Sequence, residues 1–142
     1  MGELSSFYHT LRVRYSEIDG QGIVFNSHYL TYCSLAMTEY FRAGGIPVAG
    51  EDEFDYVVVK ATMEFRASAR LDELLDIHVS APKLGEKSFT FDFEVHPSEG
   101  ETPGEPYLTA EIVCVAYDTG TNRAHPIPPV VRERLLAPAK LG

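Results

Sequence analysis

Apolar and polar residues alternate with a period of two in five segments of the chain, which is the spacing of half-buried β-strands. The five segments cover residues 7–16, 56–69, 77–81, 89–95 and 107–117. The length of the second segment indicates a strand that curves. The short turn Leu84-Gly85-Glu86 joins the third and fourth segments, which therefore form a predicted β-hairpin.

Between the first two predicted strands the pattern changes to that of a helix. Ser27 is its predicted N-cap, the helix ends near Ala43, and Gly44 and Gly45 supply a left-handed stop before Pro47. The apolar positions within it are Tyr29, Leu30, Tyr32, Cys33, Leu35, Ala36, Met37, Tyr40 and Phe41. They cover far more than one narrow stripe, so we expect other structure to wrap this helix.

The remaining segments complete the expected fold. A second, short helix is predicted over Val130–Leu136, and the Pro-, Gly- and Glu-rich stretch 97–106 is a predicted loop. There is no internal repeat and no linker, so residues 1–142 are expected to form a single domain. One early helix followed by four strands predicts an α+β fold, a five-stranded antiparallel sheet wrapped around one long buried helix.

Composition narrows the classes of function. The chain has 12 basic and 21 acidic residues, a net charge of -9, which opposes binding to nucleic acid or to an anionic membrane. No apolar run is long enough for a signal peptide or a membrane span. Cys33 and Cys114 lie in dissimilar contexts and are expected to be free thiols, which fits a cytoplasmic protein.

Cofactor chemistry has no signature in the sequence. The histidines lack the close pairing of a zinc site, and the chain contains no Cys-x-x-Cys motif. A Gly-rich phosphate-binding loop is also missing. We therefore expect neither a metal nor a cofactor.

Asp19 is the residue best placed to do chemistry. It stands just before the predicted helix, where N–H groups lack intrahelical partners and can hold an oxyanion. A carboxylate in that place can attack a thioester carbonyl or activate a water molecule. Asp-Gly is also one of the commonest turn dipeptides, so the residues alone leave a turn former and a catalyst both open.

The segment from Val13 to Leu30 resembles the signature of the 4-hydroxybenzoyl-CoA thioesterase family of hotdog proteins, including its Tol-Pal-associated branch. Residues 19–24, Asp-Gly-Gln-Gly-Ile-Val, follow the family pattern of Asp, any two residues, Gly, an aliphatic residue and Val. Three later segments agree in order and spacing: Thr38-Glu39-Tyr40, Phe65–Asp72 and Arg123–Pro128. The resemblance implies a hotdog fold and hydrolysis of an acyl-CoA to a carboxylic acid and CoA.

Carried over to this chain, the family's catalytic carboxylate falls on Asp19, and Asn26 lies at the helix start that polarises the carbonyl. The Tol-Pal-associated branch commonly has a histidine where Asn26 stands. An amide can orient a water or donate to the thioester oxygen, but it cannot shuttle a proton at neutral pH. Proton transfer is therefore assigned to Asp19 and water. The implied substrate-binding residues at this end are Gly22, Phe25, Ser27 and His28.

Coenzyme A brings phosphates, so an enzyme for its esters needs cations at the mouth of its site. Lys83, Lys87 and Arg123 fall in turns or at strand ends, and the resemblance favours Lys87 together with Ser88. Solvated surface charge is the alternative interpretation for each cation. The acidic balance of the chain also argues against acyl carrier protein, itself strongly acidic, as the donor.

Two other reactive side chains have simpler interpretations. Glu39 lies where another hotdog branch keeps its carboxylate, but beside Asp19 it is expected to be structural and to pair with an arginine. Cys33 lies in mid-helix among apolar residues with no basic neighbour, which predicts a core thiol and not a nucleophile.

Assembly and two rival functions complete the expectations. Members of the family are at least dimers with sites at the subunit boundary, which implies a homo-oligomer here, with a tetramer favoured. One rival is a hotdog hydratase or dehydratase, whose usual His-Phe-Pro segment is missing. The other is a non-catalytic acyl-CoA sensor, which would lack a working carboxylate, so the presence of Asp19 argues against it. The sequence does not identify the acyl group of the substrate.

Overall fold

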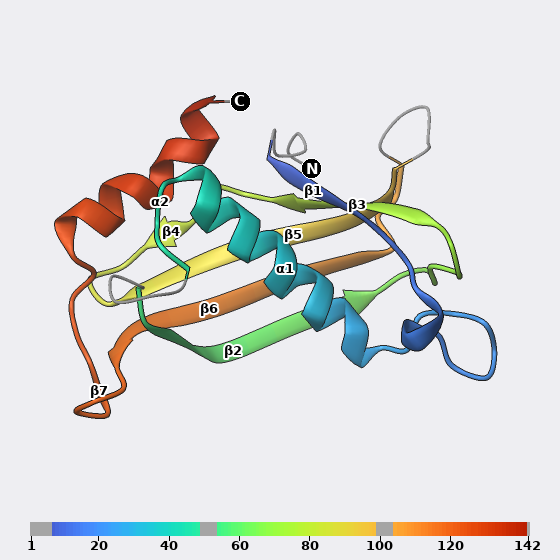
Figure 1. The fold of residues 1–142 in the computed structure, drawn as a ribbon, viewed down its shortest axis with the longest axis horizontal. Helices are drawn as coiled ribbons and strands as arrows, with labels where there is room; N and C mark the ends of the chain where they lie inside the picture. Colours follow the sequence, from blue (N-terminus) through green and yellow to red (C-terminus); the bar gives the residue numbers. More distant parts are fainter. Residues whose placement is uncertain (1–6, 49–53, 99–103, 142) are drawn as a thin grey trace.

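The computed structural model describes residues 7–48, 54–98 and 104–141. One antiparallel sheet curls around a long helix, and a second helix crosses one end of that helix (Figure 1). In sheet order the strands are β1 (Tyr8–Arg12), β3 (Leu74–Val79), β5 (Ser88–Pro97), β6 (Leu108–Asp118) and β2 (Tyr56–Phe65). The remaining elements are η1 (Tyr15–Glu17), α1 (Ser27–Ala43), β4 (Lys83–Leu84), β7 (Arg123–Ala124) and α2 (Pro129–Leu141). The predicted sheet of five strands around a helix is confirmed, with the two-residue strands β4 and β7 added to it.

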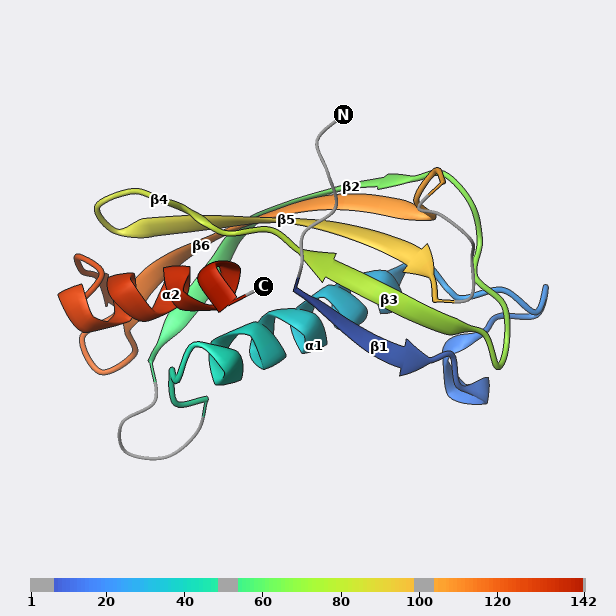
Figure 2. The same cartoon turned by 90° about the horizontal axis from the view of Figure 1, so that it is seen from above.

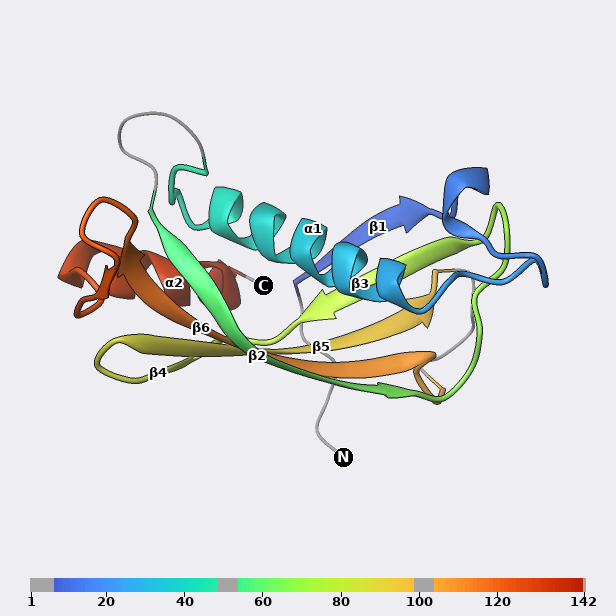
Figure 3. The ribbon, with the colours of Figure 1, turned by 90° about the horizontal axis from the view of Figure 1, so that it is seen from below.

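The core lies between the concave face of the sheet and α1 (Figure 2 and Figure 3). Alternate residues of β3, β5 and β6 point inward and are fully buried, as the period-two pattern predicts. On the helix, Tyr32, Cys33 and Met37 are at most 1% exposed. Leu30 and Leu35 are exceptions, with 38% and 43% of their surface exposed. The chain therefore wraps most of α1 but leaves these two apolar side chains partly uncovered.

The predicted first strand, residues 7–16, is too long. Strand β1 ends at Arg12, and the chain then turns through the 3-10 segment η1. The turn forms because the Glu17 N–H donates to the Arg14 carbonyl at 2.9 Å and the Glu17 carboxylate accepts the Arg14 N–H at 2.9 Å. Tyr15, predicted on the buried side of a strand, is consequently 79% exposed.

Strand β2 also departs from its predicted pattern. It ends at Phe65 and not near residue 69, and a β-bulge between Val58 and Lys60 shifts its register against β6. As a result Val57 lies opposite Val115 while Ala61 lies opposite Ile112, so Val57 and Ala61 point to opposite faces of the sheet. Uninterrupted alternation over residues 56–69 would place Val57 on the same face as Ala61, Met63 and Phe65, and this prediction is therefore wrong for Val57.

Helix α1 ends in a Schellman motif, and this end of the helix packs against α2. The Ile46 N–H donates to the Phe41 carbonyl at 2.9 Å, and the Gly45 N–H donates to the Arg42 carbonyl at 3.0 Å. Of the two glycines predicted as a left-handed stop, only Gly45 has a positive φ, 76°. Helix α2 is longer than the predicted 130–136, because it continues through Pro138.

Replacing Gly44 with alanine is expected to destabilise the protein. An added Cβ would lie 2.4 Å from the main-chain oxygen of Arg134 in α2, so one helix would have to move. Overpacking of this kind costs about 1–3 kcal/mol, which urea unfolding followed by circular dichroism can measure. Gly20→Ala is the matched control, because nothing lies within 4 Å of its Cβ. Equal stability of the two variants would contradict the close helix contact.

Candidate active site

Asp19 opens a tight hairpin between η1 and α1. Its N–H donates to the Ile23 carbonyl at 2.9 Å, and its carbonyl accepts the Gly22 N–H at 3.0 Å. Gly22 has a φ of 78°, which a residue with a Cβ adopts only with strain. The Asp19 Oδ1 atom accepts the Gln21 N–H at 2.8 Å, so Asp19 does act as a turn former. Within the described part of the chain no donor reaches its Oδ2 atom, which leaves that oxygen available for chemistry.

The hairpin is fixed to the segment that follows β2. The Val24 N–H donates to the Ala69 carbonyl at 2.9 Å, and Ile23 forms an isolated bridge with Arg70. The Phe25 N–H closes the base of the hairpin on the Glu17 carbonyl at 2.9 Å. Three main-chain contacts therefore hold Asp19 between two other parts of the chain.

Helix α1 begins directly after this hairpin. Its N-cap is Asn26 and not the predicted Ser27, and the Asn26 side chain makes no capping hydrogen bond. The His28 N–H donates to the Phe25 carbonyl at 3.0 Å. Among the residues that the structure describes, the N–H groups of Asn26 and Ser27 have no acceptor. The helix start thus offers two free donors to an incoming oxygen, as the sequence predicts.

Asp19 and Asn26 border the same cavity, which has a volume of about 390 Å³. Its lining residues are Asp19, Ile23, Val24, Phe25, Asn26, Phe65, Arg66, Ala67 and Ser68. The structure therefore brings together the predicted catalytic pair and Phe25, while Gly22, Ser27 and His28 lie beside the cavity on the same hairpin and helix turn. Arg66 and Ser68 were not predicted as site residues, although two polar residues just after a strand end are a usable signal.

The predicted CoA-binding residues Lys87 and Ser88 lie elsewhere in the chain. Ser88 is paired with Val115 of β6, whereas Phe65 at the cavity is paired with Leu108, seven residues away along the same strand. At the rise of a β-strand this separation is roughly 20 Å. One protomer alone therefore does not place Lys87 near Asp19.

A second cavity, of about 520 Å³, lies beyond the C-terminal end of α1, where Ile46 and Pro47 line it. It is bordered by α2 and by the end of β6, with Tyr117, His125 and Arg134 among its polar residues. The His125 Nδ1 atom lies 2.8 Å from the Pro126 carbonyl, and Arg134 donates to the Gly45 carbonyl at 2.9 Å. Its two carboxylates are engaged in local contacts as well, since Asp118 Oδ1 accepts the Gly120 N–H at 2.9 Å and Asp55 Oδ2 accepts the Thr119 hydroxyl at 3.4 Å.

The other reactive side chains are structural, as predicted. Burial raises the pKa of Cys33 to about 12 and that of Cys114 to about 12, so neither thiol ionises near neutral pH. Both cysteines are free and buried. Glu39 forms an ion pair with Arg42 one turn further along α1. None of the three is a nucleophile.

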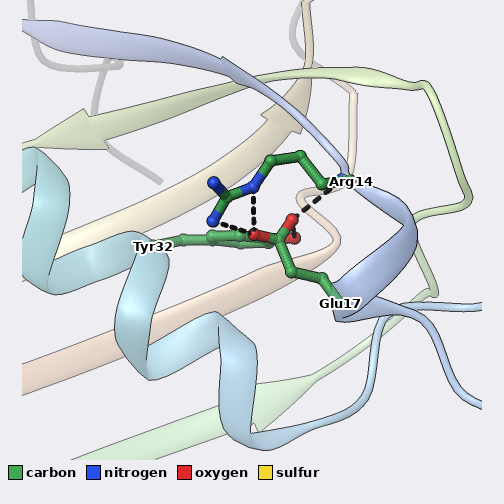
Figure 4. Close-up of polar contacts among 3 residues, drawn as sticks. All are labelled: Arg14, Glu17 and Tyr32. Carbon is green, nitrogen blue, oxygen red and sulfur yellow. Dashed lines mark hydrogen bonds and ion pairs between the residues drawn. The ribbon is translucent and has the colours of Figure 1, made fainter.

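One buried carboxylate near the site was not singled out from the sequence. Glu17 is 4% exposed, and its carboxylate accepts hydrogen bonds from the Arg14 N–H, the Arg14 guanidinium and the Tyr32 hydroxyl (Figure 4). Burial acts to raise the pKa of Glu17, but the bonds from Arg14 and Tyr32 outweigh it and the pKa lies below its usual value. The Glu17 carboxylate is therefore ionised at neutral pH.

No group of three or more His, Cys, Asp or Glu side chains within residues 7–48, 54–98 and 104–141 is placed to hold a metal ion. In the same ranges no helix has the length and apolar character needed to cross a bilayer.

A curled antiparallel sheet around a helix, with Asp19 and the helix N-cap Asn26 on one cavity, fits a hotdog protein of the thioesterase class. The family model described as "Thioesterase-like superfamily" matches residues 13–135, and the chain belongs to this family. The acyl-CoA thioester hydrolase YbgC of Escherichia coli is 28% identical over 110 residues, which cover 76% of this chain and 79% of YbgC. The predicted enzyme class and family are confirmed.

Solved structures agree with the fold. A thioesterase from Thermus thermophilus, complexed with coenzyme A and Zn, has a TM-score of 0.80 at 23% identity, with 98% of each chain covered. Slr0204, a 1,4-dihydroxy-2-naphthoyl-CoA thioesterase from Synechocystis, also has a TM-score of 0.80, at 18% identity, and covers 91% of this chain and 94% of its own. The predicted hotdog fold is confirmed.

Proposed function

We propose that this protein is an acyl-CoA thioesterase, a single hotdog domain that acts in the cytoplasm and converts an acyl-CoA and water into a carboxylic acid and CoA. One observation carries the proposal: Asp19 and Asn26, the N-cap of α1, border one cavity. Relatives named as acyl-CoA thioester hydrolases give independent support.

The geometry supports a reaction in two stages. The thioester oxygen accepts hydrogen bonds from the N–H groups of Asn26 and Ser27, which stabilise the negative charge that develops on it. The Asp19 Oδ2 atom then either attacks the carbonyl carbon or removes a proton from a water molecule that does so. The carbon–sulfur bond breaks and the CoA thiolate leaves. On the nucleophilic route a water molecule then hydrolyses the anhydride between the acyl group and Asp19, which frees the acid and restores the carboxylate. The Asn26 amide donates to the oxygen or orients the water, and no cofactor is required.

The protein is proposed to work as a homodimer joined through β2. This strand is the last one in the sheet, and Val58, Val59 and Phe65 on it are 48%, 57% and 53% exposed. Antiparallel pairing of β2 with its copy would extend the sheet and bring the Tyr56 end of one protomer to the Phe65 end of the other. Lys87 of the partner subunit then approaches the Asp19 cavity. A tetramer of two such dimers is the assembly favoured by the family.

Thiol release from a panel of aliphatic and aromatic acyl-CoAs tests the function directly. We expect at least one ester to be hydrolysed with a kcat/KM of about 10⁴ M⁻¹ s⁻¹ or higher. Tight binding of the esters without hydrolysis would favour the sensor instead. Addition of water to an enoyl-CoA, without thiol release, would favour the hydratase. The panel also identifies the acyl group.

Substitution of Lys87 with alanine is expected to raise the KM for acyl-CoA about tenfold, the cost of one charged phosphate contact. The KM for the matching acyl-pantetheine, which has no nucleotide, should not change. Lys83→Ala is the control from the same hairpin, because Lys83 already pairs with Asp92 at 3.8 Å. Equal KM values for Lys87→Ala and wild type would remove Lys87 from the binding site.

A further inference from the structure

We propose that Glu17 and Tyr32 are positioning residues that hold the Asp19 carboxylate in register with the start of α1; this inference rests on the proposed function. Neither residue borders the cavity, and neither is assigned a direct chemical role. Their contact connects the two halves of the site, the hairpin that carries the carboxylate and the helix that carries the donors.

The contact is short and shielded from water. The Tyr32 hydroxyl donates to the Glu17 Oε1 atom at 2.8 Å, and Tyr32 is only 1% exposed (Figure 4). The Arg14 guanidinium holds the other oxygen, with its Nε atom 2.8 Å and its Nη2 atom 2.7 Å from Oε2. Both carboxylate oxygens are thus engaged, and the Glu17 side chain has one defined orientation.

The position of Glu17 determines that of the reactive groups. Asp19 follows two residues later, and the Glu17 carbonyl accepts the Phe25 N–H immediately before α1. A shift of Glu17 would therefore change the distance between the Asp19 carboxylate and the start of α1. Tyr32 lies in the second turn of the same helix, so its hydroxyl ties the hairpin to the element that carries the free N–H groups.

The opposite wall of the cavity is held by the same part of α1. The Ala69 N–H donates to the Tyr29 hydroxyl oxygen at 3.0 Å, and Tyr29 and Tyr32 pack edge to face with ring centroids 5.9 Å apart. Phe65 packs against the Tyr29 ring at 5.8 Å. Two adjacent tyrosines thus set the separation of the hairpin from residues 65–69, and with it the width of the cavity.

Stability alone does not require this arrangement. A buried carboxylate that is fully hydrogen-bonded contributes little more than an apolar residue of the same shape, whereas it fixes geometry far more strictly. Arg14 would also satisfy Glu17 without any help from α1, and its side chain is 71% exposed, on the outer side of the contact. The hydroxyl of Tyr32 is the part of the network that adds a link to the helix.

Tyr32→Phe tests the inference, with Tyr40→Phe as its matched control. Both tyrosines are buried on α1 and donate one hydroxyl hydrogen bond, Tyr32 to Glu17 at 2.8 Å and Tyr40 to the Leu135 carbonyl at 2.7 Å. The Tyr40 bond lies at the other end of the helix. We expect both variants to lose similar thermal stability. Only Tyr32→Phe should lower kcat, by about tenfold or more, with KM within twofold of wild type.

Glu17→Gln is the second variant, which keeps the shape of the side chain and should also lower kcat selectively. Equal kcat values in Tyr32→Phe and Tyr40→Phe would overturn the inference, as would a rise in KM with kcat unchanged. Asp19→Asn separates this failure from that of the function. If Asp19→Asn is inactive while the two Tyr→Phe variants match, only the positioning role is wrong; if Asp19→Asn is fully active, the proposed mechanism is wrong as well.

Discussion

Replacing Asp19 with asparagine is expected to lower kcat about 10³-fold while leaving the fold intact. The variant loses the only carboxylate among the described residues that border the cavity, and with it the group proposed to attack the thioester or to take a proton from water. It keeps an oxygen that can accept the Gln21 N–H, now at 2.8 Å from Oδ1, and asparagine is as well suited to this turn as aspartate. Steady-state kinetics of thiol release and the thermal midpoint of unfolding measure the two parts of this prediction.

Glu39→Gln is the matched control for Asp19→Asn, because it removes a carboxylate from the far end of α1. Glu39 pairs with Arg42 and does not border the cavity, so its variant should keep the wild-type kcat. A fall in kcat of less than about threefold in Asp19→Asn would rule out both a nucleophilic and a general-base role for that carboxylate.

Most of the fold could be predicted from local patterns, because a strand or helix that buries one face has apolar residues at a regular spacing along its sequence. The boundaries were less accurate, for reasons that the structure makes clear. Alternation continues through residues 13–16, but the contact between Arg14 and Glu17 turns the chain there. The bulge after Val58 changes the side of the sheet to which the preceding residues of β2 point, and no glycine or proline marks its position in the sequence.

Some residues of the candidate site are neighbours in the sequence, and others are brought to it only by the fold. Residues 19–28 are contiguous, so the carboxylate and the helix start could be predicted together. The opposite wall, with Arg66 and Ser68, follows β2 and is brought next to Asp19 only when the chain folds. The link between Glu17 and Tyr32 spans fifteen residues, and a glutamate beside an arginine is usually exposed, so nothing in the pattern distinguishes this buried one.

The largest structural effect is expected from Val59→Lys, which should convert the proposed dimer into monomers and abolish most of the activity. Val59 is 57% exposed at the bulge, near the middle of β2, where a twofold axis would place it close to the same region of its copy. The two new ammonium groups would then face each other in an apolar contact. Such like-charge placement costs several kcal/mol, and on the order of 3 kcal/mol weakens association more than 100-fold.

Sedimentation velocity of wild type and Val59→Lys measures the assembly, and thiol release in the same samples measures the activity. Val130→Lys is the matched control, since Val130 is 51% exposed on α2 and is not part of β2, so the change should alter neither mass nor kcat. Activity should fall in step with the loss of dimer, because Lys87 of the partner subunit is proposed to contribute to CoA binding. A fully active monomer of Val59→Lys would show instead that the Asp19 cavity is complete within one chain. Arg66, which lines this cavity, would then be the candidate cation for the CoA phosphates.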